Sequence, residues 1–288
     1  MKLITYRRGA GADPEPGVLL ADTAVSLAPL GFTDMISVLA ADETSRFSIQ
    51  EFLDGSPPDY AVTPLDRITL LAPIPRPPKF ICVGLNYRDH AAESHSEIPS
   101  VPTIFSKFSN TVTAPGGPIV LPKNSTKPDY EAELAFVVGR GGRHIAAENW
   151  WRHVAGYTIV NDVSARDFQR ATSQWLMGKT FDTFAPMGPW ITTADEIADP
   201  HGLNIRLTLN GELMQNSNTR ELIFKIPELV AFLSSVVTLE PGDIVATGTP
   251  AGVGFARTPP RWLRPGDDAR ITIDGLGELR NPVVAETT

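Results

Sequence analysis

The chain has 288 residues, a formal net charge of −8 and 42% hydrophobic residues. This negative charge argues against nucleic acid or an anionic membrane surface as the main partner. The single cysteine, Cys82, excludes an internal disulfide and a zinc site built from cysteines. No apolar run is long enough to span a bilayer, and the first residues lack the apolar core of a signal peptide, so the sequence predicts a cytoplasmic protein without a membrane partner.

Residues 1–71 are predicted to form a small N-terminal α+β domain. Short apolar runs at Lys2–Tyr6, Val18–Ala21 and Val25–Ser26 are typical of strands separated by turns. Between residues 34 and 54 the apolar side chains follow helical spacing, and Asp34 is a candidate helix cap. The prolines of 72–79 then indicate a stiff, extended linker, so we place the domain boundary between residues 71 and 72.

Residues 72–288 are predicted to form a second, predominantly β domain, so the fold class of the whole chain is α+β. The strand-like segments are Phe80–Gly84, Thr103–Lys107, Gly156–Asp162, Trp190–Thr193, Asn204–Leu209, Ile244–Thr247 and Ala269–Ile273. Helical patterns occupy Ala146–Val154, Val163–Gln174 and Ile226–Ser235. The 26 prolines and 23 glycines agree with a chain that has many turns.

Two glutamates stand out at the start of the strand-like run 131–138. Successive side chains of a strand point to opposite faces, so Glu131 and Glu133 share one face and Ala132 and Leu134 the other. Two such close carboxylates repel each other unless a positive charge lies between them, and a hard divalent cation such as Mg²⁺ or Mn²⁺ takes carboxylate oxygens. Asp162, at the end of a neighbouring predicted strand, is a candidate third carboxylate. The alternative is a solvated edge strand with two exposed glutamates.

Two further pairs of polar residues have the spacing of one helix face. His90 and Glu93 are three residues apart, and so are Arg166 and Gln169. For His90 and Glu93, the alternative is an exposed surface pair with an ordinary histidine. The Gly-Lys-Thr at 178–180 lacks the preceding glycine of a phosphate-binding loop. The glycine-rich segment 247–254 lacks the strand–turn–helix context of a dinucleotide site, and its glycines would let backbone amides approach an anionic ligand.

Several of these motifs, taken together and in order, resemble those of the fumarylacetoacetate hydrolase family. The resemblance covers about Pro73 to Val284 and rests on Gly84–His90, Asp129–Leu134, Asn161–Asp167, Gly178–Lys179 and Leu239–Gly254. It implies a mixed β-sandwich-roll catalytic domain, pairing into homodimers, and a divalent metal, Mg²⁺ or Mn²⁺. The N-terminal domain resembles the extension found in longer bacterial members.

The resemblance also implies roles for individual residues. Glu131, Glu133 and Asp162 correspond to the metal ligands of the family. His90 and Glu93 correspond to its water-activating pair, and Lys179 to its active-site lysine, for which a buried salt bridge to a site carboxylate is the structural alternative. The residues that fall where related enzymes hold the substrate are Lys107, Arg166, Gln169 and Thr249.

Members of this family act on 2-oxo acids, so the resemblance implies a small-molecule 2-oxo acid substrate. The leading hypothesis is a hydrolase that cleaves a C–C bond of a 2,4-dioxo acid, either acylpyruvate-like or a 2,4-dioxo-3-deoxy sugar acid, through a metal-stabilised enolate. The alternative is an oxaloacetate decarboxylase or tautomerase, or a 2-hydroxyhepta-2,4-diene-1,7-dioate isomerase, that uses the same site. The pair of His90 and Glu93 favours hydrolysis, because decarboxylation requires no activated water. A third alternative is a catalytically silent metal- or metabolite-binding protein.

Overall fold

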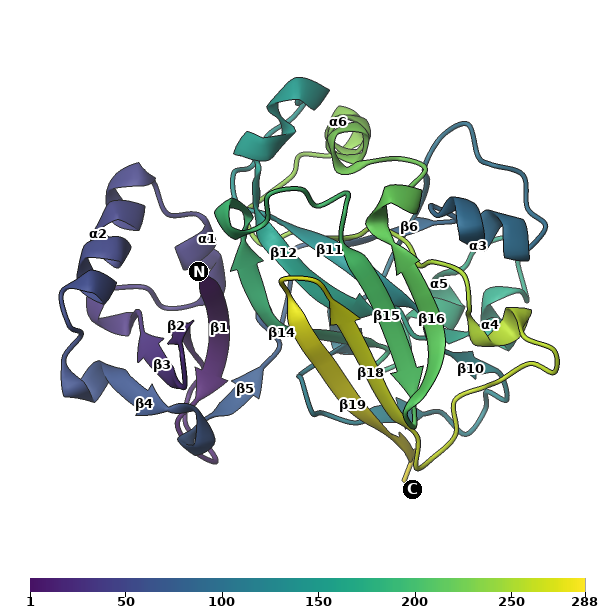
Figure 1. Cartoon of the computed structure of the whole chain (residues 1–288), viewed down its shortest axis with the longest axis horizontal. Helices are drawn as coiled ribbons and strands as arrows, with labels where there is room; N and C mark the ends of the chain where they lie inside the picture. The colour runs from purple at the N-terminus through teal and green to yellow at the C-terminus, as the bar shows by residue number, and fades with distance from the viewer. Residues whose placement is uncertain (288) are drawn as a thin grey trace.

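The largest sheet runs through both the N-terminal unit (residues 1–71) and the rest of the chain. The computed structural model describes residues 1–287 (Figure 1). This sheet has 12 strands. Its main path runs through β4 (Val62–Pro64), β3 (Thr23–Ser26), β2 (Glu15–Leu20), β1 (Lys2–Arg7), β14 (Ala185–Thr193), β12 (Val154–Asn161), β11 (Ala132–Val138), β17 (Ile244–Ala246), β6 (Phe80–Gly84) and β7 (Thr103–Ser106). Off this path, β5 (Thr69–Leu71) pairs with β1 and β8 (Val112–Thr113) with β14.

The N-terminal unit folds as the local sequence signals predict. The side chain of Asp34 caps α1 (Met35–Leu39) by accepting the N–H of Ser37 at 2.7 Å, which satisfies a donor that the helix itself leaves free. Asp42 caps α2 (Glu43–Asp54) in the same way. The helical structure predicted between residues 34 and 54 is therefore confirmed as two helices, both drawn in purple at the left of Figure 1.

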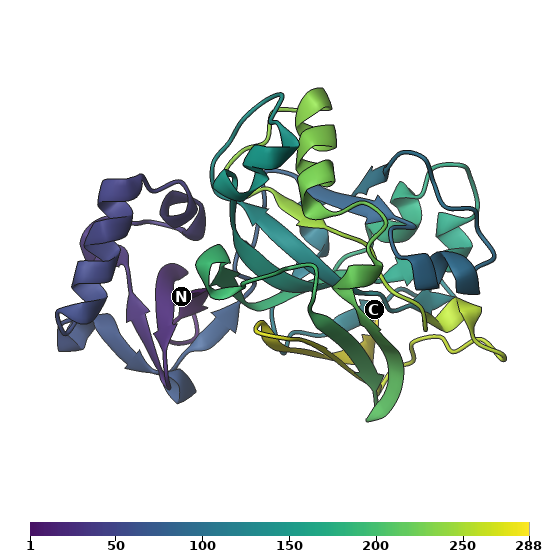
Figure 2. The same ribbon diagram turned by 45° about the horizontal axis from the view of Figure 1, so that its top comes forward.

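The N-terminal unit also shares a hydrophobic core with the sheet it joins. Strand β1 pairs with β14 through Lys2 and Leu3. Leu3, Val18 and Met35 are buried in one cluster with Val137 and Ile244, which lie on β11 and β17. Figure 2 shows the unit beside the remaining body of the protein. The division into two domains at residue 71 stays a prediction.

A second sheet completes the larger body. It has five strands in the order β16 (Glu212–Asn218), β15 (Asn204–Leu209), β18 (Asp268–Ile273), β19 (Gly277–Ala285) and β9 (Ile119–Leu121). Apolar side chains from both sheets, among them Phe136, Ile159, Ile205 and Ile271, form the main core. Helix α6 (Ile226–Val236) adds Leu229 to this cluster. The mixed, strand-rich fold is confirmed, whereas the sandwich-roll arrangement stays a prediction.

Three short elements frame the region of the predicted site. They are α3 (Arg88–Glu93), α4 (Arg166–Gln169) and α5 (Leu176–Lys179), and a two-stranded sheet of β10 (Pro128–Asp129) and β13 (Ser164–Ala165) lies with them. The long helix predicted over 163–174 is wrong. The chain turns back after Gln169, because α5 packs so closely on α4 that a Cβ on Gly178 would lie 2.3 Å from the amide nitrogen of Gln169.

Two other predictions concern helices. The segment predicted as a helix at 146–154 is a 3-10 helix over Ala147–Arg152, after which β12 begins. Within residues 1–287, no helix combines the length and the apolar character that crossing a membrane requires.

The shared core makes a prediction about the N-terminal unit. Removing residues 1–71 would uncover the apolar side chains of β11 and β17 and the edge of β14. We expect the shortened chain to aggregate or to melt at least about 10 °C below the full chain, because each buried apolar side chain contributes a few kcal/mol. Differential scanning calorimetry of both chains measures the difference. Equal melting temperatures would show instead that residues 72–288 form an independent domain.

Candidate metal centre and catalytic pocket

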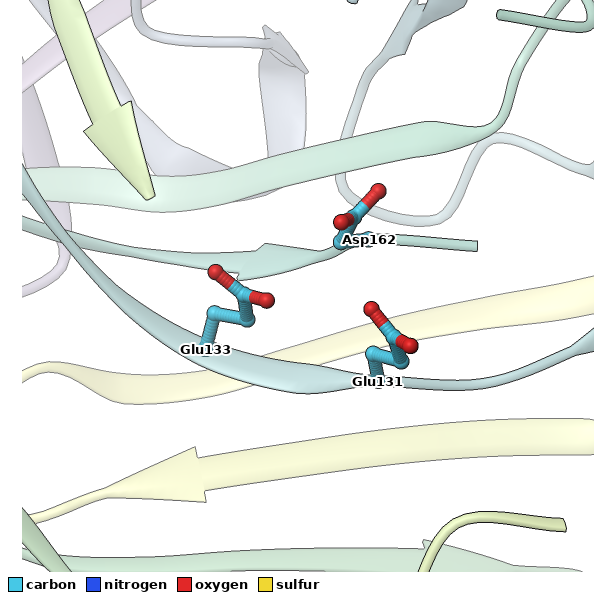
Figure 3. Close-up of side chains that lie close together, drawn as sticks. All are labelled: Glu131, Glu133 and Asp162. Carbon is cyan, nitrogen blue, oxygen red and sulfur yellow. The ribbon is translucent and has the colours of Figure 1, made fainter. Parts of the chain in front are cut away.

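Strand β11 and the end of β12 bring three carboxylates together. Glu131 immediately precedes β11 and Glu133 lies within it, on the face opposite to the core residue Leu134. Asp162 follows β12, and its N–H donates to the carbonyl of Glu131 at 2.9 Å. One carboxylate oxygen from each residue lies within 4.8 Å of the other two (Figure 3). The alternative of a solvated edge strand is wrong, since β11 lies between β12 and β17 and Glu133 is only 2% exposed.

Three cationic side chains neutralise two of these carboxylates. The ammonium of Lys179 donates to Glu131 and to Asp162, at 2.6 Å in each case. The guanidinium of Arg166 lies 2.6 Å from the other oxygen of Glu131. Lys107 donates to the other oxygen of Asp162 at 2.5 Å. The buried salt bridge considered for Lys179 is therefore present.

The third carboxylate, Glu133, has no such cation. Among residues 1–287, the N–H of Gly248 donates a hydrogen bond to the Glu133 carboxylate at 2.8 Å. Burial raises the pKa of Glu133 well above its usual range, and the charges of Asp162 and Glu131 raise it further. Burial would also raise the pKa of Glu131, but the charges of Arg166 and Lys179 outweigh it and hold that pKa well below the usual value.

This donor set fits a hard divalent cation. All three groups are carboxylates, which are the ligands that Mg²⁺ and Mn²⁺ prefer. A cation beside Glu133 would also offset the burial and the like charges that together raise the pKa of this side chain. The residues present therefore fit the metal that the sequence predicts.

His90 and Glu93 form a hydrogen-bonded pair on α3. The Nδ1–H of His90 donates to Oε1 of Glu93 at 2.7 Å, and the second oxygen of Glu93 accepts the N–H of Gly252 at 2.8 Å. The imidazole packs edge-on against the ring of Phe255, at 6.1 Å between ring centroids. His90 is only 8% exposed, so the alternative of an exposed surface pair is wrong.

The glycine-rich segment 247–254 fixes the site carboxylates through its backbone. Both Gly248 and Gly252 have positive φ, at 103° and 102°, a conformation that favours glycine. The N–H groups of Gly248, Gly252 and Gly254 donate to Glu133, Glu93 and Asp129, at 2.8, 2.8 and 2.7 Å. The amides expected to meet an anionic ligand are thus bound to anionic side chains of the protein itself.

A cavity of about 230 Å³ joins these groups. Of the predicted site residues, it is lined by His90, Glu131, Glu133, Arg166, Gln169, Lys179 and Thr249. Glu93, Lys107 and Asp162 are not part of this lining. Glu93 is hydrogen-bonded to His90, Asp162 to Lys179, and Lys107 to Asp162. Lys107 also donates to the carbonyl of Val163 at 3.0 Å, so its ammonium supports Asp162.

Two residues that sequence reasoning did not assign to the site hold it together. Asp129 accepts the Nε–H of Arg166 at 2.9 Å, and this ion pair is buried. Gln215 accepts the N–H of Ala132 at 2.9 Å and donates to the hydroxyl of Thr249 at 2.8 Å. The position of Asp129, two residues before Glu131, was a signal in the sequence that it belongs to the site. Nothing in the sequence around Gln215 sets that residue apart.

Residues 79–284 match the protein family described as Fumarylacetoacetate (FAA) hydrolase C-terminal. The chain belongs to the fumarylacetoacetate hydrolase family. The mitochondrial oxaloacetate tautomerase of Xenopus laevis is 44% identical to it over 297 residues, which cover 99% of this chain and 90% of the relative.

Solved structures of fumarylacetoacetate hydrolase family proteins resemble the chain along its whole length. A maleylpyruvate hydrolase from a Sphingobium species, solved with manganese(II) and pyruvate, is 34% identical, with a TM-score of 0.83 and 100% of both chains covered. A 2-hydroxyhepta-2,4-diene-1,7-dioate isomerase from Mycobacterium marinum is 35% identical, with a TM-score of 0.77 and 100% of both chains covered. The chain is an enzyme of this family, and the alternative of a silent binding protein is set aside.

The uncompensated charge of Glu133 makes a prediction about the metal. Glu133→Gln keeps an oxygen for the N–H of Gly248 but removes a ligand charge and the repulsion from Glu131 and Asp162. We expect calorimetric titration with Mn²⁺ to show one site per chain in the wild type and none in the variant. Without metal, the variant should melt at the same temperature as the wild type or higher. The exposed Glu148→Gln serves as control, and wild-type Mn²⁺ binding by Glu133→Gln would contradict the assignment.

Proposed function

We propose that this enzyme interconverts the keto and enol forms of a small 2-oxo dicarboxylic acid of the oxaloacetate type, with Mg²⁺ or Mn²⁺ as cofactor. One observation carries the proposal. The imidazole of His90, backed by Glu93, lines the same small cavity as the carboxylates of Glu131 and Glu133. The tautomerase relative that is 44% identical over 99% of the chain supports this choice of reaction.

In this proposal Glu131, Glu133 and Asp162 hold the cation. When bound, a divalent cation supplies Lewis-acid stabilisation to the enolate of a 2-oxo acid. Burial lowers the pKa of Lys179, but the negative charges of Asp162 and Glu131 outweigh burial and raise it overall. The ammonium therefore keeps a fixed positive charge at the cavity wall. Fixed charges of this kind stabilise negative charge that develops in the transition state.

His90 carries the proton transfer. The imidazole takes a proton from C3 of the acid and returns a proton to the oxygen on C2, so the keto and enol forms differ only in the position of one hydrogen. The carboxylate of Glu93 stabilises the positive imidazolium that exists between these two steps, and the N–H of Gly252 keeps that carboxylate in place. General acid–base catalysis of this type accelerates a reaction by about 10²–10⁴-fold.

Hydrolysis of an acylpyruvate-like acid is the second candidate. The same imidazole would take a proton from a water that attacks the distal carbonyl, after which the C–C bond breaks and the electron pair forms the enolate of a 2-oxo acid. The likeness to the maleylpyruvate hydrolase solved with manganese(II) and pyruvate favours this candidate. The sequence alone placed hydrolysis first, and the greater identity to the tautomerase reverses that order. Decarboxylation or isomerisation would use the same enolate without an activated water.

The role of His90 predicts which of these reactions each variant should lose. His90→Ala should lower kcat for oxaloacetate tautomerisation by about 10²-fold or more, and Glu93→Gln should lower it in the same direction. Metal-dependent decarboxylation of oxaloacetate should change far less, because it requires no proton transfer from C3. Enol absorbance and CO₂ release measure the two reactions on the same samples.

The exposed His95→Ala is the control for this experiment. Acetylpyruvate cleavage by the wild type, abolished in His90→Ala, would favour the hydrolase candidate. Tautomerisation by His90→Ala within a few-fold of the wild-type rate would show that His90 is not the base.

We also propose that the protein pairs into a homodimer through the edge formed by β7. Strand β7 ends the largest sheet, and unpaired edge strands readily pair with another chain. Beside it lies an apolar hollow of about 960 Å³ whose lining includes Ile104, Phe108 and Val236. Val236 is 66% exposed and Phe108 51%, and apolar side chains gathered in this way are typical of protein interfaces.

A charge in this hollow tests the homodimer. Val236 is exposed at the C-terminal end of α6, and Val236→Glu places a carboxylate in the apolar surface, so we expect it to shift the protein from dimer to monomer. Sedimentation equilibrium measures the mass of both proteins. Leu213→Glu, an exposed position on β16 outside the hollow, should leave the dimer intact. A dimer that withstands Val236→Glu would place the interface elsewhere.

The cytoplasmic location stays a prediction, because the Xenopus laevis relative is mitochondrial.

A further inference from the structure

The cavity is lined by a cationic side chain, Arg170, that has no role in the proposed chemistry. Arg170 follows α4 by one residue, and its N–H donates to the carbonyl of Arg166 at 3.1 Å. The side chain lines the same cavity as His90 and Glu133. Arg170 is exposed, and its guanidinium carbon lies 4.4 Å from the centroid of the Phe255 ring, a contact that favours a position beside the cavity.

The partners of the two neighbouring arginines differ. Arg166 stacks on the same ring at 4.7 Å, but its guanidinium donates hydrogen bonds to Asp129 and Gln169 and forms an ion pair with Glu131. Among residues 1–287, no carboxylate lies within 4.0 Å of the Arg170 guanidinium, and the guanidinium donates no hydrogen bond. Arg170 is therefore a positive charge at the cavity that no described acidic group of the protein neutralises.

The cavity is also small. Trp175 and Phe105 form one part of its wall and contact each other edge-to-face, at 5.5 Å between ring centroids. Trp175 packs directly on the backbone of Gly84, where a Cβ would lie 2.3 Å from the indole ring. A cavity of about 230 Å³ with this aromatic wall suits a small acid better than a long acyl chain.

We propose that Arg170 binds the distal carboxylate of the substrate and so makes the enzyme selective for short 2-oxo dicarboxylates over monocarboxylates. This inference rests on the proposed function. The guanidinium presents a planar pair of N–H donors that matches a carboxylate in two parallel hydrogen bonds. The 2-oxo acid end lies at Glu131, Glu133 and Asp162, and the opposite end of the substrate meets Arg170.

The test compares acids that differ only in the distal carboxylate. Oxaloacetate and its 4-methyl ester serve as substrates for kinetics of the wild type, Arg170→Gln and Arg170→Lys. Malate and lactate serve as ligands that do not enolise, and their binding to the Mn²⁺-loaded proteins is measured by calorimetry. Arg67→Gln, an exposed arginine of the N-terminal unit, is the control.

We expect Arg170→Gln to raise KM for oxaloacetate about 10- to 100-fold, with kcat changed by less than about threefold, and to leave the ester unaffected. The variant should weaken malate binding by a similar factor but not lactate binding, and Arg170→Lys should recover part of the loss. Equal losses for malate and lactate, or no loss for either, would overturn the inference. Absence of turnover with both substrates, together with Arg170-dependent malate binding, would refute the proposed reaction and uphold the role of Arg170.

Discussion

The pocket depends on the balance of charge around three carboxylates buried within 4.8 Å of one another. Two unit charges 4 Å apart repel by roughly 4 kcal/mol at the effective dielectric constant of a protein surface, and by more in the interior. Lys179, Arg166 and Lys107 offset this repulsion at Glu131 and Asp162. Glu133 is left without a cation, so the most favourable place for an added positive charge is beside it.

The fold brings these charges from distant parts of the chain to one place. Strand β11 supplies two carboxylates, the end of β12 the third, and α5 supplies Lys179. The glycine-rich segment 247–254 then holds Glu133, Glu93 and Asp129 by backbone amides. A side chain at Gly254 would separate its amide from Asp129, since a Cβ there would lie 2.5 Å from the carboxylate. One segment thus orients both the carboxylate centre and the pair on α3.

The sequence was sufficient for those features of the site that depend on local periodicity. Alternation along 131–138 placed Glu131 and Glu133 on one face, and a spacing of three residues placed His90 beside Glu93 and Arg166 beside Gln169. The start of α1 was also predicted, because capping depends on residues a few positions apart.

The features that were missed depend on contacts between residues far apart in the chain. Gln215 reaches Ala132 and Thr249 from a different sheet, and no local pattern records such a contact. The break after α4 follows from the contact between Gly178 and Gln169, and helical spacing alone extended that helix too far. Arg170 was unremarked because its lack of an acidic partner becomes visible only when its neighbours in space are known.

Crystals grown with Mn²⁺ and oxalate, which mimics the chelating end of a 2-oxo acid, test the central role of the three carboxylates most directly. Anomalous diffraction at the manganese absorption edge locates the ion without reference to activity. We expect one manganese peak per chain, with oxygens of Glu131, Glu133 and Asp162 among its ligands and oxalate on the side of the cavity. A manganese ion bound elsewhere, with Glu133 making no contact to it, would contradict the assignment of this carboxylate centre as the metal site.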